Sequence, residues 1–143
     1  MLQTIEEASK NFCIHQIREP FEVVDGVSDK RTLIAYIDID TQEGKKFRVY
    51  IASDEAFMQR VSKLFIEEDE SDEETLIDMT LETANLIIGS AKVIAEEGNE
   101  TSYTINTPHF EKIDKFDFAY DDAKTIKVAD DEITIAIKEL DAK

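Results

Sequence analysis

The chain has 143 residues, of which 42% are hydrophobic, and a formal net charge of −17. This length and composition predict one domain, residues 1–143, that buries about two thirds of its unfolded surface. The acidic balance argues against nucleic acid and anionic membranes as partners, because both attract basic surfaces.

Few residues of the chain could support redox, metal or nucleophilic chemistry. A single cysteine, Cys13, excludes an internal disulfide framework, and with two histidines, His15 and His109, it makes neither a zinc set nor a convincing nucleophile and base. No apolar run approaches the roughly 20 residues that span a bilayer, and no signal-peptide pattern is present. We therefore expect a cytoplasmic protein that binds no metal and no cofactor of its own.

The spacing of apolar residues predicts a helix followed by three strands in the first part of the chain. The helix covers residues 2–15, and its apolar face would hold Ile5, Ala8, Phe12 and, as a further candidate, His15. The strands are predicted at Phe21–Val24, Thr32–Asp40 and Lys46–Ala52.

Two more helices and four more strands are predicted after residue 52. One helix runs from the N-cap Ser53 to Phe65, and a long one runs from Asp72 to Glu97, where Gly98 and Asn99 stop it. The strands are Ser102–Thr107, Phe116–Tyr120, Thr125–Val128 and Glu132–Lys138, with hairpin turns at Asp121–Asp122 and Asp130–Asp131. This order predicts an α+β fold, a mostly antiparallel β-sheet packed against two long helices.

An acidic segment, Glu67–Glu74, precedes the long helix and has two interpretations. The first is a helix start, in which Ser71 caps the helix, Glu74 completes a capping box, and Asp72 and Glu73 favour the positive end of the dipole. The second is an ion-binding loop. An EF-hand would need a glycine at its sixth position, and the segment contains no glycine, so we favour the helix start.

Polar residues of the long helix gather on one face. Asp78, Glu82, Asn85 and Gly89 follow one another at spacings of four, three and four residues, which place them side by side, and Lys92 widens the strip. The rest of the circumference is nearly all apolar or small, including Leu76, Ile77, Leu81, Ala84, Leu86, Ile87, Ile88, Ala91, Val93, Ile94 and Ala95. We expect the helix to be mostly buried, with the strip left open to solvent or to a partner.

Gly89 needs an explanation, because glycine inside a helix costs about 1 kcal/mol relative to alanine. Either the helix packs closely on the sheet at this point, or a docking partner approaches closely.

Asp78 likewise has two interpretations, a hydrogen-bonding role near the helix start or a direct contact with a partner. Pro108 is expected to end a strand and to fix the loop beside the strip.

At these residues the sequence resembles the CheC/CheX/FliY family of phosphatases that act on the chemotaxis response regulator CheY. The family pattern is Asp or Ser, Glu after three residues, Asn after two more, and Pro somewhat over twenty residues downstream. Asp78, Glu82, Asn85 and Pro108 fill these places, with 22 residues between Asn85 and Pro108. A single site in a chain of this length resembles CheX more than CheC, which tends to carry two.

The resemblance implies a protein phosphatase that removes the aspartyl phosphate of a CheY-like receiver domain. Its catalytic residues would be Glu82 and Asn85, supported by Asp78, Gly89 and Pro108. Asn85 would position the attacking water, and Glu82 would pair with the receiver's active-site lysine. The Mg²⁺ would belong to the receiver, and the protein would form a homodimer.

Two alternatives stay open. A non-catalytic adaptor of the same fold would bind a receiver or a flagellar protein without hydrolysing anything. A structural dimer module would use an exposed edge strand or the long helix for self-association. Glu82 and Asn85 together favour the enzyme over both.

Overall fold

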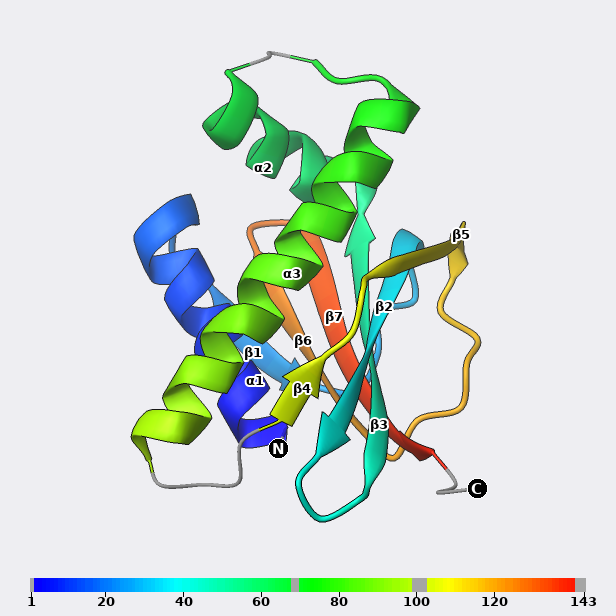
Figure 1. Ribbon diagram of the computed structural model, residues 1–143. Coiled ribbons are helices and arrows are strands. Elements are labelled where there is room, and N and C mark those ends of the chain that lie inside the picture. Colours follow the sequence, from blue (N-terminus) through cyan, green and yellow to red (C-terminus); the bar gives the residue numbers. More distant parts are fainter. Residues whose placement is uncertain (1, 68–69, 99–102, 141–143) are drawn as a thin grey trace.

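In a computed structural model, which describes residues 2–67, 70–98 and 103–140, helices cover one face of a twisted antiparallel sheet (Figure 1). In chain order the elements are α1 (Leu2–Phe12), the π-helix η1 (Cys13–Ile17), β1 (Glu22–Asp25), β2 (Arg31–Thr41), β3 (Lys46–Asp54), α2 (Glu55–Ile66), α3 (Glu73–Glu97), β4 (Tyr103–Ile105), β5 (His109–Lys115), β6 (Asp122–Val128) and β7 (Asp131–Leu140). None of the helices so described is long and apolar enough to cross a bilayer.

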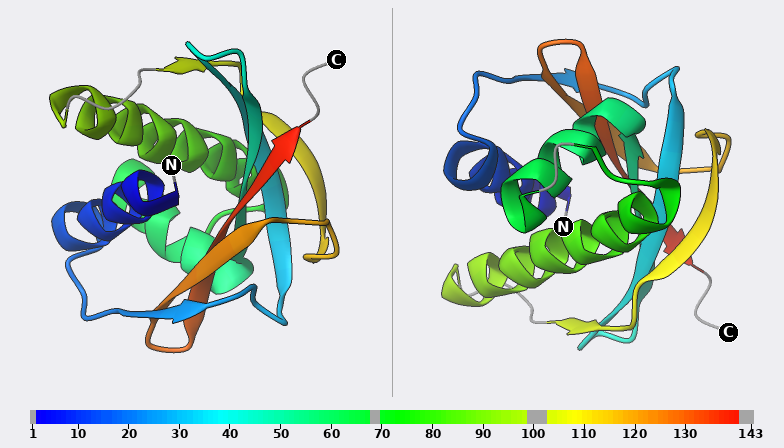
Figure 2. Two further views of the ribbon diagram at one scale, coloured as in Figure 1. Left: turned by 90° about the horizontal axis from the view of Figure 1, so that it is seen from below. Right: turned by 90° about the horizontal axis from the view of Figure 1, so that it is seen from above.

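The seven strands described form one sheet in the order β1-β6-β7-β3-β2-β4, with β5 also paired to β2, and every pairing is antiparallel. The predicted α+β class and antiparallel sheet are therefore confirmed. All the helices lie on the same side of the sheet, which is clear when the molecule is seen along the layers (Figure 2). The main core lies between these two layers and includes Ile5, Phe57, Met58, Ile87 and Ile88.

The expectation of two long helices is wrong. The described part of the chain has three α-helices, and only α3 is long, with 25 residues against 11 in α1 and 12 in α2. The first helix ends three residues earlier than predicted, because the chain continues from Phe12 into η1. In this wider turn Cys13 and Ile17 are buried and His15 is exposed, so His15 does not belong to the apolar face.

Both predicted helix caps are one residue too early. Asp54 rather than Ser53 caps α2, and its Oδ1 accepts a hydrogen bond of 2.7 Å from the Phe57 amide. Asp72 rather than Ser71 caps α3 by accepting from the Thr75 amide at 2.9 Å. Hydrogen bonds from the Thr75 side chain and then from its amide lower the pKa of Asp72. An aspartate in the next position takes the cap in each case. Of the acidic segment, Glu68 and Asp69 lie outside the described residues.

The predicted strand Phe116–Tyr120 is also wrong. The strand in this part of the chain is β5, which begins seven residues before the predicted strand. Residues 116–121 form a connection that leads to β6. Phe116 and Phe118 pack on Tyr50, with ring centroids 5.2 and 4.9 Å away, in a small second cluster on the face of the sheet opposite the main core. Their alternation thus reflects packing of the connection onto the sheet.

One of the two predicted hairpin turns is confirmed. Asp130–Asp131 lies at the turn that joins β6 to β7, which are paired neighbours. Asp121–Asp122 does not form a hairpin, because β5 pairs with β2 whereas β6 pairs with β1 and β7. The predicted strand from Ser102 to Thr107 is shorter as described, Tyr103–Ile105, and Ser102 lies outside the described residues, as does Asn99 at the predicted helix stop.

Asp54 links α2 to the β6–β7 hairpin, and its removal should destabilise the fold. The buried carboxylate also accepts from the Glu132 amide at 2.9 Å and from Lys30 Nζ at 3.2 Å. We expect Asp54→Ala to lower the free energy of unfolding by about 2 kcal/mol, since it removes a cap and leaves buried donors unpaired. Urea denaturation would measure the loss. Asp54→Asn, which keeps an acceptor oxygen, should lose less, and equal losses for both variants would contradict the argument.

Candidate functional site

The long helix α3 places the predicted polar strip on the molecular surface. Its buried side packs against β2, α1 and α2, and consists of Leu76, Met79, Thr80, Thr83, Ala84, Ile87, Ile88, Ala91 and Ala95. Asp78, Glu82 and Asn85 are exposed on the other side, and Gly89 and Lys92 are half-buried. The expectation of an open polar strip is confirmed.

The three exposed side chains of the strip are free to bind a partner. Within the described part of the chain, the side chains of Asp78, Glu82 and Asn85 form no hydrogen bond or ion pair. Asn85 can both donate through its amide group and accept through its carbonyl oxygen, and Glu82 offers a carboxylate one turn away on the same face. Glu82 therefore presents a negative charge beside the bifunctional amide of Asn85, with the carboxylate of Asp78 one turn earlier on the same face.

Gly89 is not explained by packing within the chain. A Cβ atom added at this position would have none of the described heavy atoms outside its own helical turn within 4 Å. Close packing of α3 on the sheet at Gly89 is therefore wrong as an explanation, and the helix carries a cost of about 1 kcal/mol that nothing described in this chain offsets. Of the two explanations for a glycine at this position, only the close approach of a partner remains.

Pro108 lies on the connection between β4 and β5, which runs beside α3 (Figure 1). β4 ends at Ile105 and β5 begins at His109, so Pro108 immediately precedes a strand and does not end one as expected. Two residues earlier, Asn106 holds the connection to β2, donating through its amide Nδ2 to the Asp38 carbonyl at 2.9 Å and to Asp40 Oδ2 at 3.0 Å. This anchor and the fixed φ of proline hold the loop on one flank of α3.

The sequence did not predict that the other flank of the strip exposes apolar side chains. Leu86 and Val93, which the helix pattern places among the buried residues, are 41% and 52% exposed. Leu86 lies at the edge of a groove between α1, η1 and α3, whose lining also includes Phe12, Phe65 and Ser90. Helical periodicity does not specify which apolar residues of a helix the neighbouring elements cover.

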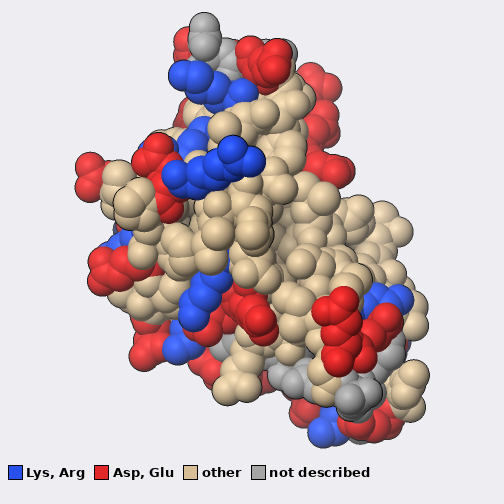
Figure 3. Space-filling view, turned by 90° about the vertical axis from the view of Figure 1, so that its left-hand side faces the viewer, with Lys and Arg blue, Asp and Glu red and all other residues tan. Residues whose placement is uncertain are grey.

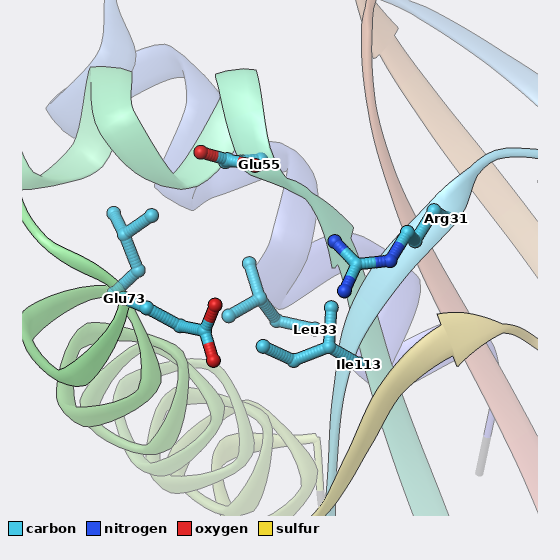
Figure 4. Close-up of a pocket in the computed structure, with 6 residues that line it drawn as sticks. Arg31, Leu33, Glu55, Glu73 and Ile113 are labelled. Carbon is cyan, nitrogen blue, oxygen red and sulfur yellow. The ribbon is translucent and has the colours of Figure 1, made fainter.

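A second hollow lies at the beginning of α2 and α3, away from the strip. The guanidinium of Arg31 points between the side chains of Glu55 and Glu73, above Leu33 and Ile113 (Figure 4). The carboxylates of Glu55 and Glu73 make this hollow unfavourable for anions.

Within the described residues no three His, Cys, Asp or Glu side chains gather as metal ligands would. Burial raises the pKa of Cys13 to about 11, so this thiol is protonated at neutral pH and is a poor nucleophile.

The antiparallel sheet and the long helix that presents Glu82 and Asn85 are the arrangement expected for the class of protein that the sequence motif resembles. The family model "Chemotaxis phosphatase CheX" matches residues 35–130, which include the whole polar strip and Pro108. The chain belongs to the CheX family. A search of curated proteins finds no match.

Solved structures share the fold over nearly the whole chain. The chain is similar to the chemotaxis protein CheX from Vibrio vulnificus, with 15% identity and a TM-score of 0.79 over 96% of this chain and 97% of that one. It is also similar to CheX in the CheX–CheY–BeF3–Mg²⁺ complex from Borrelia burgdorferi, with 16% identity and a TM-score of 0.68 over 96% and 97%. FliY from Thermotoga maritima matches with 14% identity and a TM-score of 0.55 over 93% and 83%.

Proposed function

We propose that this protein is an aspartyl-phosphate phosphatase of the CheX type, acting on a phosphorylated CheY-like receiver domain in chemotaxis. The observation that carries the proposal is the exposed pair Glu82 and Asn85, whose side chains are unpartnered in the described part of the chain and lie on the helix face opposite its buried side. Membership of the CheX family and the likeness to CheX in a complex with CheY support the same partner.

In the proposed mechanism, the active site is completed only in the complex with the receiver. Asn85 accepts a hydrogen bond from a water molecule and orients it in line with the phosphorus. The water oxygen bonds to phosphorus as the bond to the aspartyl oxygen breaks, releasing inorganic phosphate and a free carboxylate, while the water proton passes to the phosphate or to solvent. Phosphoryl transfer gains mainly from such positioning and from charge stabilisation.

The other residues of the motif have supporting roles in this proposal. Glu82 pairs with the receiver's active-site lysine, and Asp78 either orients its neighbours or contacts the partner directly. Pro108 fixes the adjoining loop. The Mg²⁺ is held by the receiver, so this chain needs no metal or cofactor of its own.

We also propose that residues 1–143 act as one cytoplasmic domain and that the protein forms a homodimer, as the family resemblance implies. The buried Cys13 thiol suits a reducing compartment. Analytical ultracentrifugation at micromolar concentration would test the dimer, and a monomer throughout that range would contradict it.

The test of the proposed function is the release of phosphate from CheY of the same organism, charged with acetyl phosphate in the presence of Mg²⁺. We expect this protein to accelerate release beyond the receiver's own rate. No acceleration, with binding to the charged receiver still detectable, would replace the phosphatase by the adaptor. Neither acceleration nor binding would contradict both.

A further inference from the structure

Gly89, a member of the polar strip, and Leu86, which borders it, must both be covered by any protein that contacts Glu82 and Asn85. Leu86 follows Glu82 by four residues, and Gly89 follows Asn85 by four. Residues at this spacing on a helix lie about 5–6 Å apart between Cβ atoms. A partner protein that binds Glu82 and Asn85 therefore also contacts Leu86 and the backbone at Gly89.

The groove continues the surface from Leu86 toward α1. Its lining includes Phe12, His15, Phe65, Leu86, Ile87 and Ser90. The rings of Phe12 and Phe65 stack, with centroids 6.1 Å apart, and join α1 to α2 beside the groove. Within the described residues no Asp, Glu, Lys or Arg side chain lines it, although the chain as a whole is strongly charged.

Exposed apolar side chains concentrate on the helical elements that surround this groove. Six of the seven large ones in the described part of the chain belong to η1, α2 and α3, namely Ile14, Leu64, Phe65, Ile66, Leu86 and Val93. This side of the molecule shows a broad uncharged area with charged side chains around its margin (Figure 3). A large uncharged area with a polar border is the usual anatomy of a protein interface.

The size of a receiver interface also requires more surface than the strip provides. Specific complexes bury about 800 Å² on each partner, far more than three polar side chains and a glycine present. The partner must therefore extend onto a flank of α3. The flank with Leu86 offers an apolar groove, which is the kind of surface that forms the core of an interface.

We propose that Gly89 and the groove edge at Leu86 form the docking subsite for the receiver domain, with receiver backbone against Gly89 and an apolar receiver side chain in the groove. This inference rests on the proposed function. The receiver is the occupant, and not a second copy of this chain, because the subsite is continuous with Glu82 and Asn85 on the same two helical turns. Gly89 is then retained for docking at the expense of helix stability.

The test uses Mg²⁺-bound receiver carrying beryllofluoride, a stable mimic of the phosphate, and measures its dissociation constant. We expect Gly89→Ala to weaken binding about tenfold or more, because a methyl group inserted into a close contact overpacks it. The same substitution should raise Tm by about 3 °C, since alanine favours the helix. Leu86→Ala should weaken binding about tenfold, whereas Leu64→Ala, at a residue 49% exposed that does not line the groove, should leave binding unchanged.

Each outcome has a separate meaning. Receiver binding by the parent protein that is unaffected by both Gly89→Ala and Leu86→Ala would overturn this inference and leave the proposed function standing. No binding by the parent protein would overturn both. Loss of a homodimer in these variants, with receiver binding unchanged, would assign the surface to a second copy and also overturn the inference.

Discussion

Replacement of Asn85 by alanine is expected to slow the catalysed release of phosphate by about 100-fold at saturating receiver, because the water would no longer be held in line with the phosphorus. The side chain is exposed and forms no hydrogen bond within the described part of the chain, so the substitution should leave stability almost unchanged. Single-turnover measurements with an excess of this protein over phosphorylated receiver would isolate the chemical step.

Asn85→Asp provides a closely matched variant. It preserves the size of the side chain and an acceptor oxygen, but it removes the amide donor and adds a negative charge beside the phosphoryl group. We expect it to be about as slow as Asn85→Ala while folding equally well. Parent-like rates for Asn85→Ala would refute the assigned mechanism, whatever the behaviour of the aspartate variant.

The long helix was predictable because its signals are local. Apolar spacing and acidic residues at its start placed it at Asp72–Glu97, and the structure has Glu73–Glu97. The same spacing placed Asp78, Glu82 and Asn85 together on an open face. Geometry within a single helix follows from residue numbers alone.

The errors occur where tertiary contacts decide between equivalent local patterns. The alternating aromatic residues after β5 predicted a strand, yet they pack against Tyr50 without pairing in the sheet. The strand that pairs with β2 is instead the charged β5. Helical periodicity likewise placed Leu86 inside, but α1 and α3 leave it at the edge of a groove. Neither outcome could be inferred without knowing which elements are neighbours.

Gly89 illustrates a question that the sequence could pose but not answer. Its cost to the helix was evident from its position, and two explanations were equally compatible with the residues around it. The empty space next to its Cα eliminates the explanation that depends on packing of the helix on the sheet. The remaining explanation links an unfavourable residue to a partner, which is why the glycine contributes to the inference about docking.

Charge reversal at Glu82 should weaken receiver binding about 100-fold. In the proposed complex this carboxylate pairs with a lysine away from water, and disruption of such a pair costs about 2–5 kcal/mol, which includes the penalty for the unpaired partner. Glu82→Lys also places two cations face to face. Titration with the Mg²⁺- and beryllofluoride-bound receiver would measure the loss.

The matched control for this experiment is Glu97→Lys, which makes the same change in net charge at an exposed position on the same helix. Fifteen residues separate the two sites, or about 22 Å along the helix axis, more than twice the screening length at physiological salt. If Glu82 acts by contact, Glu97→Lys should change the dissociation constant by less than about threefold, and high salt should not restore binding to Glu82→Lys. Equal effects of the two substitutions, both diminished by salt, would mean that the acidic surface acts only through its long-range field and that Glu82 makes no specific contact.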